Sequence, residues 1–341
     1  MNIRQQILVF AKKRRKFQTP DVSREIENKL SRQYISRVLS DLVKEKHLVK
    51  AGSTNKAFYA LPKNISVLGT RARKRLLNQD LKEHEILEAL KSQAPFTLRL
   101  RENIRSILDY AFSEMLNNAI EHSKSKRIEV EIIKQNHFLY FAVRDFGIGV
   151  FRNVMNKRNL KNEYEAMEDL LKGKTTTAPR AHSGEGIFFT SKTADKFVLE
   201  SFGFRMIVDN LIGDVFFERT KRSKRGTKVL FSILLNSKKH LNDIFRSFQS
   251  DPKSFAFDKT EIQVKLFSVG TVHVSRSQAR RILSGLDKFK VIILDFDRVP
   301  TVGQAFADEI FRVFRNRHPE IKVKPLNMNE AVEFMVRRVG K

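Results

Sequence analysis

Glu114 and Asn118 are a carboxylate and an amide four residues apart in the segment SEMLNNAIEH, residues 113–122. On a helix this spacing places both side chains on one face. An amide oxygen is a hard ligand that suits Mg²⁺, and a neighbouring carboxylate can orient or deprotonate a nucleophile. The pair therefore predicts a helix face suited to a metal-bound phosphate.

A second segment, RDFGIG at residues 144–149, directly follows a strand-like run. An aspartate at a strand end, such as Asp145, can accept a hydrogen bond from an exocyclic amine like that of adenine. Gly147 and Gly149 let the backbone approach a ligand closely. The segment is therefore a candidate for contact with a nucleotide base.

Two further segments add polar groups that suit phosphate and nucleotide. SGEGIFFT, residues 183–190, opens a helix, where Gly184 and Gly186 present free N–H groups to phosphate. GTKV, residues 226–229, begins a strand at which the hydroxyl of Thr227 can reach the nucleotide. Each short motif alone is a weak signal, because such glycine patterns arise easily in turns. Their order and structural contexts together are much more specific.

The four segments resemble, in the same order, the N, G1, G2 and final threonine elements of the GHKL superfamily. They read SEMLNNAIEHS, DFGIG, SGEGIFFTSKTAD and GTKV. This superfamily includes DNA gyrase, Hsp90, MutL, histidine kinases and anti-sigma-factor kinases. The similarity is greatest to the anti-sigma-factor kinase branch, whose N box also reads Glu-x-x-x-Asn followed by Ala. The resemblance covers about 140 residues and implies that ATP and Mg²⁺ are the cofactors.

The resemblance also implies roles for the matching positions. Asn118 would hold Mg²⁺, Glu114 would be the catalytic base or would orient the nucleophile, and Asp145 would bind the adenine amine. The two glycines of the third segment would lie under the phosphates. Cofactor contacts are expected from Asn118, Asp145, Gly147, Gly149, Lys174, Gly184, Gly186 and Thr227.

Residues 150–182 fall where the superfamily has a mobile lid over ATP. Contacts to the γ-phosphate in the closed lid are expected from Lys172, Lys174, Thr175, Arg180 or His182. A solvated basic loop is the alternative interpretation of this segment.

A histidine kinase is disfavoured by the residues that precede this region. Such enzymes carry a phosphoacceptor histidine on a long two-helix hairpin ahead of the ATP domain. His84, followed by Glu85, is the only candidate pair, and it lies on one short predicted helix with Pro95 soon after. A second long helix does not fit before Arg99, so His84 is interpreted as a surface histidine.

Hydrophobic periodicity predicts alternating helices and strands in the central part of the chain. The resemblances together imply an α+β multidomain protein whose central part is the GHKL α/β sandwich, a mixed sheet covered by helices. Central strands are expected at 127–133, 139–145, 197–202, 204–209, 215–219 and 227–234. The segments 214–220 and 226–235 flank a short basic turn and are expected to form a hairpin. The expected divisions are a winged helix at 1–63, a connector at 64–95, the ATP-binding domain at 96–236, a linker at 237–260 and a STAS-like domain at 261–341.

The N-terminal part follows the winged-helix plan of three helices and a β-hairpin. Pro20 lies near one helix start, and Ser31 is a plausible N-cap for the likely recognition helix at 31–46. Residues 1–64 hold 15 Lys and Arg against five acidic residues, which favours DNA as the partner. The expected DNA contacts are Arg32, Gln33, Ser36 and Arg37 on the helix, with Lys50 and Lys56 on the hairpin. Use of the winged helix for protein contacts is the alternative.

The overall composition narrows the class of partner. The chain has 341 residues and a formal net charge of +27, which favours a polyanion, either nucleic acid or an anionic membrane face. It contains no cysteine, so disulfides and thiolate zinc sites are excluded. It also has no apolar run long enough for a membrane helix. We therefore expect a cytoplasmic protein with DNA, and no membrane, as its partner.

The C-terminal part is expected to fold as strand, strand, helix, strand, helix, strand, helix. VIILDF at residues 291–296 and VPTVGQAFADEIF at 299–311 resemble the STAS-like family that often follows GHKL domains, with the fold of anti-anti-sigma factors. Those factors place a phosphorylatable serine at the start of the helix after this strand. This chain departs from that pattern, because it has Gly303-Gln304-Ala305 there and Thr301 is the nearest hydroxyl. Asp308 and Glu309 are interpreted as structural or contact residues, and a protein partner is expected to bind this domain.

The leading hypothesis is an ATP-responsive DNA-binding regulator. Lid closure over Mg-ATP would change how the central domain packs on the STAS-like tail or on a second subunit of a homodimer, and would thereby reposition the winged helix. The enzymatic alternative is a serine/threonine kinase of the anti-sigma type or a slow ATPase, which Glu114 favours because pure binding needs no base. A scaffold that has lost nucleotide binding is a third hypothesis, against which the intact polar set argues.

Overall fold

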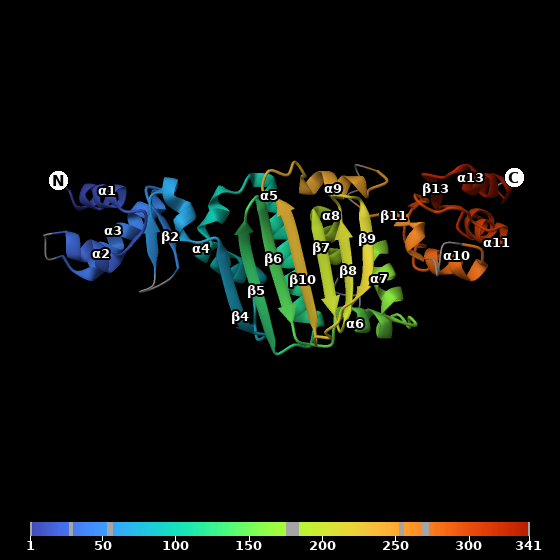
Figure 1. Ribbon diagram of the computed structural model, residues 1–341, viewed down its shortest axis with the longest axis horizontal. Coiled ribbons are helices and arrows are strands. Elements are labelled where there is room, and N and C mark those ends of the chain that lie inside the picture. The colour runs from blue at the N-terminus through green and yellow to red at the C-terminus, as the bar shows by residue number, and fades with distance from the viewer. Residues whose placement is uncertain are drawn as a thin grey trace.

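Three units follow one another along the length of the molecule in the computed structural model (Figure 1). The structure describes residues 2–26, 30–52, 57–174, 184–251, 256–267 and 273–339. A small helical unit lies at the N-terminal end, a large sheet with helices in the middle and a small α/β unit at the C-terminal end. Each unit has its own cluster of buried apolar side chains.

The N-terminal unit has the helices and the hairpin that the sequence predicts. Its helices are α1 (Ile3–Lys13), α2 (Thr19–Glu25) and α3 (Arg32–Lys44), and its sheet has the order β1 (Phe17–Gln18), β3 (Phe58–Ala60), β2 (Val49–Ala51). Ser31 accepts a hydrogen bond from the backbone N–H of Tyr34 at 3.2 Å, which confirms it as the N-cap of α3. Apolar positions one or two turns apart, such as Ile35 and Leu39, are fully buried and hold α3 against the other helices.

The central unit is a seven-stranded antiparallel sheet with the order β4-β5-β6-β10-β7-β8-β9. Its strands are β4 (Arg71–Leu77), β5 (Arg127–Gln135), β6 (Phe138–Asp145), β7 (Lys196–Ser201), β8 (Phe204–Asp209), β9 (Asp214–Arg219) and β10 (Thr227–Leu234). Buried positions alternate along most of these strands, because one face of the sheet packs on helices. The sheet therefore has one covered face, and its strand ends can carry a site.

Five helices pack on the covered face: α4 (Glu83–Gln93), α5 (Glu102–His122), α6 (Val150–Lys157), α7 (Glu163–Lys172) and α8 (Gly186–Thr193). Two 3₁₀ segments precede parts of this unit: η2 (Pro62–Leu68) comes before β4, and η3 (Pro95–Arg99) comes before α5. In Figure 1, α5 and α8 lie behind the sheet. Phe112 on α5 meets Phe141 of β6 edge to face at 5.6 Å, and Phe141 stacks on Phe231 of β10 at 4.6 Å. These rings fix α5 across the two strands whose ends carry the predicted site residues.

Residues 64–95 are more than the expected connector. β4 pairs with β5 as the edge strand of the central sheet, from Arg71 opposite Ile133 to Leu77 opposite Arg127. Ala72 on β4 and Leu90 on α4 belong to the central core. The sequence of β4 conceals this, because its exposed positions are mostly basic and only a few apolar residues mark the buried face.

The expected hairpin between β9 and β10 is wrong. β9 pairs with β8, and β10 lies between β6 and β7, so the chain passes β8 and β7 before it re-enters the sheet. The two strands differ in burial: β9 is an edge strand with exposed positions, whereas most of β10 is buried. A nearly continuous apolar strand belongs in the middle of a sheet, and this preference outweighs the closeness of the two segments in the sequence.

The C-terminal unit is a parallel three-stranded sheet with the order β11 (Lys259–Gln263), β12 (Val291–Asp295), β13 (Lys322–Leu326). Around it lie η4 (Val264–Phe267), α10 (Arg276–Leu283), α13 (Glu330–Val339) and a helical segment made of α11 (Gln304–Asp308), the wider π-helical turn η5 (Glu309–Phe314) and α12 (Arg315–Arg317). Glu309, which was expected to be structural or a contact residue, is 3% exposed and pairs with Arg280 at 2.7 Å. Its contact within the unit supports the structural interpretation.

The segment expected as a linker contains α9 (Leu241–Ser247) and takes part in a cluster of phenylalanines. We call Phe188, Phe189, Phe245, Phe248, Phe257 and Phe289 the aromatic cluster, because their rings contact one another in a chain with centroids 4.8–6.1 Å apart. Phe188 and Phe189 come from α8 of the central unit, and both belong to the buried core of the C-terminal unit. The two units are therefore joined by shared apolar packing as well as by the chain itself.

Candidate nucleotide site

One cavity of about 320 Å³ collects the ends of the segments that were singled out in the sequence. It lies among α5, the end of β6, the start of α6, the start of α8 and the start of β10. The predicted site residues that line it are Glu114, Asn118, Asp145, Gly149, Gly184, Gly186 and Thr227. Residues up to 113 positions apart in the chain thus share one hollow, as a nucleotide site requires.

Helix α5 presents its polar face to this cavity. Met115, Leu116 and Ala119 are buried in the central core, and this fixes the rotation of the helix so that Glu114 and Asn118 line the hollow. The Nδ2 atom of Asn118 is buried and has no hydrogen-bond partner among the described residues. A buried amide group left in this state suits a ligand that supplies the missing partner.

Asp145 ends β6 and lies at another wall of the cavity. The side chain is 4% exposed, and its Oδ1 accepts hydrogen bonds from the backbone N–H groups of Gly147 at 2.9 Å and Thr227 at 3.2 Å. Burial raises the pKa of Asp145, while the two N–H donors act in the opposite direction. A buried carboxylate held in this way is a fixed acceptor for an amine of a ligand.

Thr227 connects the strand end to the start of α6. Its Oγ1 accepts a hydrogen bond at 3.0 Å from the backbone N–H of Val150, the first residue of α6. Gly226 adopts a φ of +86°, and a β-carbon there would overlap the backbone of Asp145. Glycine at this position therefore allows β10 to approach the end of β6 closely enough for the Asp145–Thr227 hydrogen bond.

The start of α8 forms the wall opposite Asp145. Gly184 has a φ of +74°, and Gly186 is the first residue of the helix, whose N-terminal N–H groups favour anions. A β-carbon on Gly186 would overlap the carboxylate of Glu114. The absence of a side chain at Gly186 therefore lets Glu114 reach the beginning of α8.

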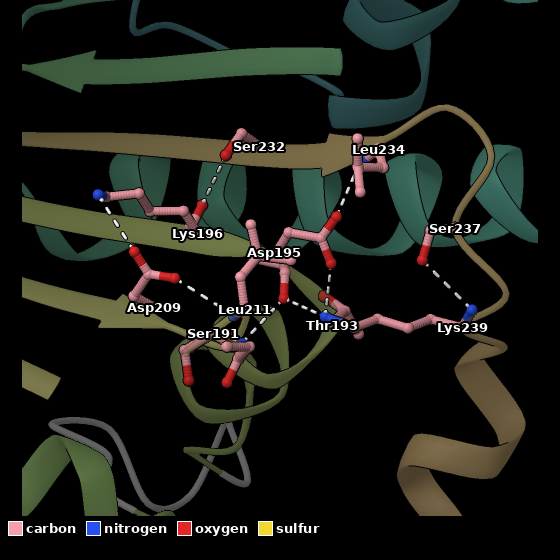
Figure 2. Close-up of polar contacts among 12 residues, drawn as sticks. Ser191, Thr193, Asp195, Lys196, Asp209, Leu211, Ser232, Leu234, Ser237 and Lys239 are labelled. Atoms are coloured by element: carbon pink, nitrogen blue, oxygen red, sulfur yellow. Dashed lines mark hydrogen bonds and ion pairs between the residues drawn. The ribbon is translucent and has the colours of Figure 1, made fainter. Parts of the chain in front are cut away.

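A polar network holds the other end of α8 in place (Figure 2). Asp195, just after the helix, accepts hydrogen bonds from the backbone N–H of Leu234 at 2.8 Å and pairs with Lys239 at 2.9 Å. Asn210 donates to the backbone carbonyls of Ser191 and Ala194. Because α8 is anchored at its C-terminal end to β10 and β8, its N-terminal end has a defined position at the cavity.

The donor set of the cavity fits Mg²⁺ that is shared with phosphates. Within the described ranges no cluster of three or more His, Cys, Asp or Glu side chains could hold a metal alone. Mg²⁺ usually keeps waters and takes one or two protein oxygens together with substrate phosphates, for which the side-chain oxygens of Glu114 and Asn118 suffice. The carboxylates of Glu114, Glu121 and Glu185 also line the cavity, and negative charge there favours a cation. Burial, followed by the charges of Glu114 and Glu185, raises the pKa of the nearby Tyr110.

Two expected contacts lie elsewhere. Gly147 is outside the cavity lining, and a β-carbon there would overlap the carbonyl of Ser123, so its role is to let the backbone pass close to the end of α5. Lys174 also lies outside it: its Nζ donates to the carbonyl of Lys288 at 3.3 Å and lies 5.0 Å from the ring centroid of Phe289. The attraction of the aromatic rings and of a carbonyl in the C-terminal unit holds this ammonium away from the cavity. Thr175, Arg180, His182 and Lys56 lie outside the described residues.

The lid-side helix α7 carries buried charges against the C-terminal unit. Lys172 donates to the carbonyls of Arg281 at 2.8 Å and Ser284 at 3.0 Å, and Glu168 pairs with Arg281 at 3.2 Å. The hydroxyl of Thr260 on β11 donates to the carbonyl of Lys172. Lys172, expected to contact a γ-phosphate, therefore joins α7 to the C-terminal unit, because two backbone carbonyls there accept hydrogen bonds from its buried ammonium.

Several polar residues of the cavity were not singled out in the sequence: Asn117, Glu121, His122, Asn153 and Glu185. Positions 117, 121 and 122 follow Glu114 and Asn118 at helical spacing, so an extended face of α5 could have indicated them. Asn153 comes four residues after Gly149, and this spacing also places it on the cavity side of α6. The DNA candidates Arg32, Gln33, Ser36 and Arg37 are exposed on α3, far along the chain from this cavity, and Lys50 is exposed on β2.

Comparisons with known families agree with this geometry. Residues 103–237 match the family described as histidine kinase-, DNA gyrase B-, and HSP90-like ATPase. A GHKL-type ATPase domain is therefore present in the centre of the chain. Residues 278–333 match a STAS-like domain of unknown function. Neither match extends to residues 1–63, so the winged helix remains a prediction, and comparison with curated proteins found no match.

The GHKL match begins at α5 and ends just after β10, so it spans every predicted residue of the cavity. The two family matches confirm the GHKL and STAS-like resemblances, and the structure confirms the α+β multidomain fold class. The central sheet was expected to be mixed, but every described strand pair in it is antiparallel. Among the described helices, none combines the length and the apolar character that crossing a membrane requires.

Proposed function

We propose that this protein is an ATP-binding regulator in which Mg-ATP, bound by the GHKL domain, controls DNA binding by the N-terminal unit. The observation that carries the proposal is the single cavity in which Asn118, Asp145, Gly184 and Thr227 meet. Asp145 would accept the adenine amine, and Asn118 with Glu114 would face Mg²⁺ and the phosphates at the start of α8. ATP with Mg²⁺ would supply the charge and the bulk that favour a closed lid.

The contacts of α7 and α8 support control through the C-terminal unit. Leu170 of α7 and Gly186 of α8 line the cavity, so a bound nucleotide touches both helices. A few residues further on, Lys172 and Phe188 enter the C-terminal unit. Any shift of either helix on nucleotide binding must therefore be taken up by that unit, which gives the STAS-like domain a direct link to the nucleotide.

The DNA-binding part of the proposal rests on α3 and the hairpin. Arg32, Gln33, Ser36 and Arg37 lie on the exposed side of α3, where arginine and glutamine can reach base edges and serine can reach phosphates. Lys50, and Lys56 beside the described part of the hairpin, would contact the backbone. We place the protein in the cytoplasm, which its lack of cysteine favours.

Binding of a fluorescent ATP analogue with Mg²⁺ tests the central claim. The wild type should bind, and Asp145→Asn should lose most of the affinity, because the amide cannot accept from the adenine amine and from both N–H donors in the same way. Asp297→Asn is the matched control, since Asp297 is an exposed aspartate paired only with its neighbour Arg298 among the contacts of the described chain. No binding by the wild type, or equal binding by both variants, would reject the proposal.

A second experiment tests whether the aromatic cluster transmits ATP binding to the DNA affinity of the protein. Phe257 is 7% exposed, and its ring contacts those of Phe188 and Phe189 at 4.9 and 4.8 Å. Phe257→Ala should leave a cavity between the units, so that adding Mg-ATP no longer changes DNA affinity in a fluorescence-anisotropy titration. Phe257→Leu, which keeps most of the apolar contact, should retain the response. An undiminished response of Phe257→Ala would exclude this route.

An enzymatic function is favoured by one observation, the position of Glu114 beside the start of α8. There Glu114 would take the proton of a hydroxyl or a water that attacks the γ-phosphorus, while ADP leaves. Incubation with γ-labelled ATP separates the outcomes: label on Thr301 or on a partner protein indicates a kinase, and free phosphate that disappears in Glu114→Gln indicates an ATPase. If neither product forms while the nucleotide binds, the protein is a sensor only.

A further inference from the structure

Two adjoining hollows lie at the end of the central sheet, on the outer side of the nucleotide cavity. Their volumes are about 230 and 650 Å³, and Phe202 and Arg225 line both. The first is formed by the β7–β8 turn, the β9–β10 loop and the neighbouring strand ends, and the second by the start of α6. In Figure 1 these elements meet at the lower edge of the central sheet. We call the two hollows together the basic groove.

The charge of the basic groove is strongly one-sided. The first hollow is lined by seven Lys and Arg residues and one carboxylate, Glu200, which pairs with Arg205 at 2.6 Å. The second is lined by four Lys and Arg residues and no carboxylate. The side chains of the loop, Lys221, Arg222, Lys224 and Arg225, are exposed, and none of them forms an ion pair with a carboxylate of the described residues.

The unpaired cations of this loop contrast with those on another edge of the sheet. On the other edge of the same sheet, Arg73 and Arg75 of β4 pair with Glu129 of β5 at 2.7 and 3.0 Å. There the chain supplies its own counter-charges, whereas the four cations of the β9–β10 loop, Lys221, Arg222, Lys224 and Arg225, form no ion pair with a carboxylate of the described residues and can face an external anion. Cations concentrated in a hollow raise the local concentration and the association rate of such an anion.

The loops that carry these cations are held in place. The backbone N–H of Thr220 donates to the carbonyl of Gly203 at 2.8 Å, and that of Phe202 donates to the carbonyl of Lys224 at 3.2 Å. The hydroxyl of Ser201 donates to the carbonyl of Gly226 at 3.0 Å. The β7–β8 turn and the β9–β10 loop therefore form one hydrogen-bonded frame, which presents the cations with little ordering cost on binding.

Phe202 gives the groove an aromatic surface. It adopts a φ of +46°, which is unusual for a residue other than glycine, and its ring lies under the guanidinium of Arg152 with 3.9 Å between the charge centre and the ring centroid. The strained turn and the stacked arginine hold the ring at the junction of the two hollows. Arginine and an aromatic ring in one charged groove are typical of surfaces that bind the backbone and bases of nucleic acid.

We propose that the basic groove of the ATPase domain binds the sugar-phosphate backbone of a nucleic acid. The cations are spread over two connected hollows instead of converging on one point, as they would for a single phosphate. This inference goes beyond the proposed function, since it does not require that the N-terminal unit bind DNA. It also places the nucleic acid beside the nucleotide cavity, because Thr227 lines both the cavity and the first hollow, and Asn153 lines both the cavity and the second.

The experiment uses the full chain and a triple charge reversal, Lys221→Glu with Arg222→Glu and Arg225→Glu. Arg315→Glu with Arg317→Glu and Lys324→Glu is the matched control, because these exposed cations of the C-terminal unit give the same change in net charge. Binding of a fluorescein-labelled random-sequence 30-mer, single- and double-stranded, is titrated at several salt concentrations. The loop variant should lose at least about tenfold in affinity, and the salt slope for duplex should fall by about 2 to 3, as expected for three lost phosphate contacts.

Retained binding of the fluorescent ATP analogue shows that the loop variant is folded. The proposal is overturned if the loop variant and the control lose the same affinity, if the wild type binds neither DNA probe, or if the loop variant loses only binding to phosphatidylserine vesicles. A separate variant, Arg32→Ala with Arg37→Ala, distinguishes this proposal from the proposed function. If only this variant loses binding of the DNA probes, the proposal that the basic groove binds nucleic acid is overturned, and the N-terminal unit is the DNA-binding site.

Discussion

The carboxylate of Asp145 accepts a hydrogen bond from the backbone N–H of Thr227, 3.2 Å away and 82 residues later in the chain. This contact joins two central neighbours in the sheet, β6 and β10, at the end where the cavity lies. The hydroxyl of the same threonine accepts from Val150 and so fixes the start of α6. One residue thus links Asp145, the strand that walls the cavity and the start of α6.

Removing the Thr227 hydroxyl should therefore weaken nucleotide binding. In Thr227→Val the shape of the side chain is nearly kept, but the partly buried N–H of Val150 loses its acceptor, which costs about 1 kcal/mol. We expect a lower thermal unfolding midpoint and weaker binding of a fluorescent ATP analogue. Thr227→Ser keeps the hydroxyl and should behave like the wild type. If Thr227→Val binds as tightly as Thr227→Ser, the hydroxyl has no part in forming the site.

The sequence indicated which residues line the cavity better than it indicated which strands lie side by side. The site residues belong to local patterns. The pair Glu114 and Asn118 depends only on helical spacing, and Asp145 with its glycines depends only on the end of a strand. The position of β10 between β6 and β7 depends on pairing between distant segments, which no local pattern contains, and a hairpin with β9 was the wrong expectation. Local signals fix what a segment can do, whereas competition among strands for the buried centre fixes where it lies.

The segment expected to form a lid, residues 150–182, also shows that contacts with distant segments could not be predicted from local sequence. Lys172 and Lys174 were natural candidates for phosphate contacts because basic residues in a lid suit an anion. Their actual partners are the carbonyls of Arg281, Ser284 and Lys288 in another unit. Phe188 and Phe189 likewise follow the glycine motif, but the residues they contact come from a stretch with little periodicity. Contacts between units could not be inferred from either segment alone.

A methyl group at Gly186 should disturb Glu114 specifically. The added β-carbon of Gly186→Ala would overlap the end of the Glu114 side chain, which is flexible and can turn away at little cost in stability. We expect weaker binding of the ATP analogue and an unfolding midpoint close to that of the wild type.

The matching test is a double-mutant cycle with Glu114→Ala. Removing the carboxylate removes the overlap, so Gly186→Ala should have much less effect on nucleotide affinity in the Glu114→Ala background. Equal effects in both backgrounds would mean that the methyl group acts on the phosphates or on α8, and not through Glu114.

The buried charges between α7 and the C-terminal unit should make stability depend on pH. Burial raises the pKa of Glu168 from 4.5 to about 7, against the charges of Arg281 and Lys172. Between these two pH values the folded protein keeps a proton that the unfolded chain has released. The contribution of Glu168 to the free energy of unfolding therefore falls as pH rises from 4.5 to 7, by up to about 1.4 kcal/mol per pH unit.

Lys172 acts in a second window with the opposite slope. Burial lowers its pKa from 10.5 to about 8, so between pH 8 and 10.5 the unfolded chain holds a proton that the folded protein has lost. Stability from this group therefore rises with pH across that window. Together the two groups contribute least to stability near pH 7 to 8.

Thermal unfolding of two variants across these windows measures both slopes. Glu168→Gln cannot ionise, so the midpoint of the wild type relative to this variant should fall steadily between pH 5 and 7. Relative to Lys172→Met, the wild type should instead gain stability between pH 8 and 10. Differences that stay constant with pH would show that neither side chain changes its protonation on folding.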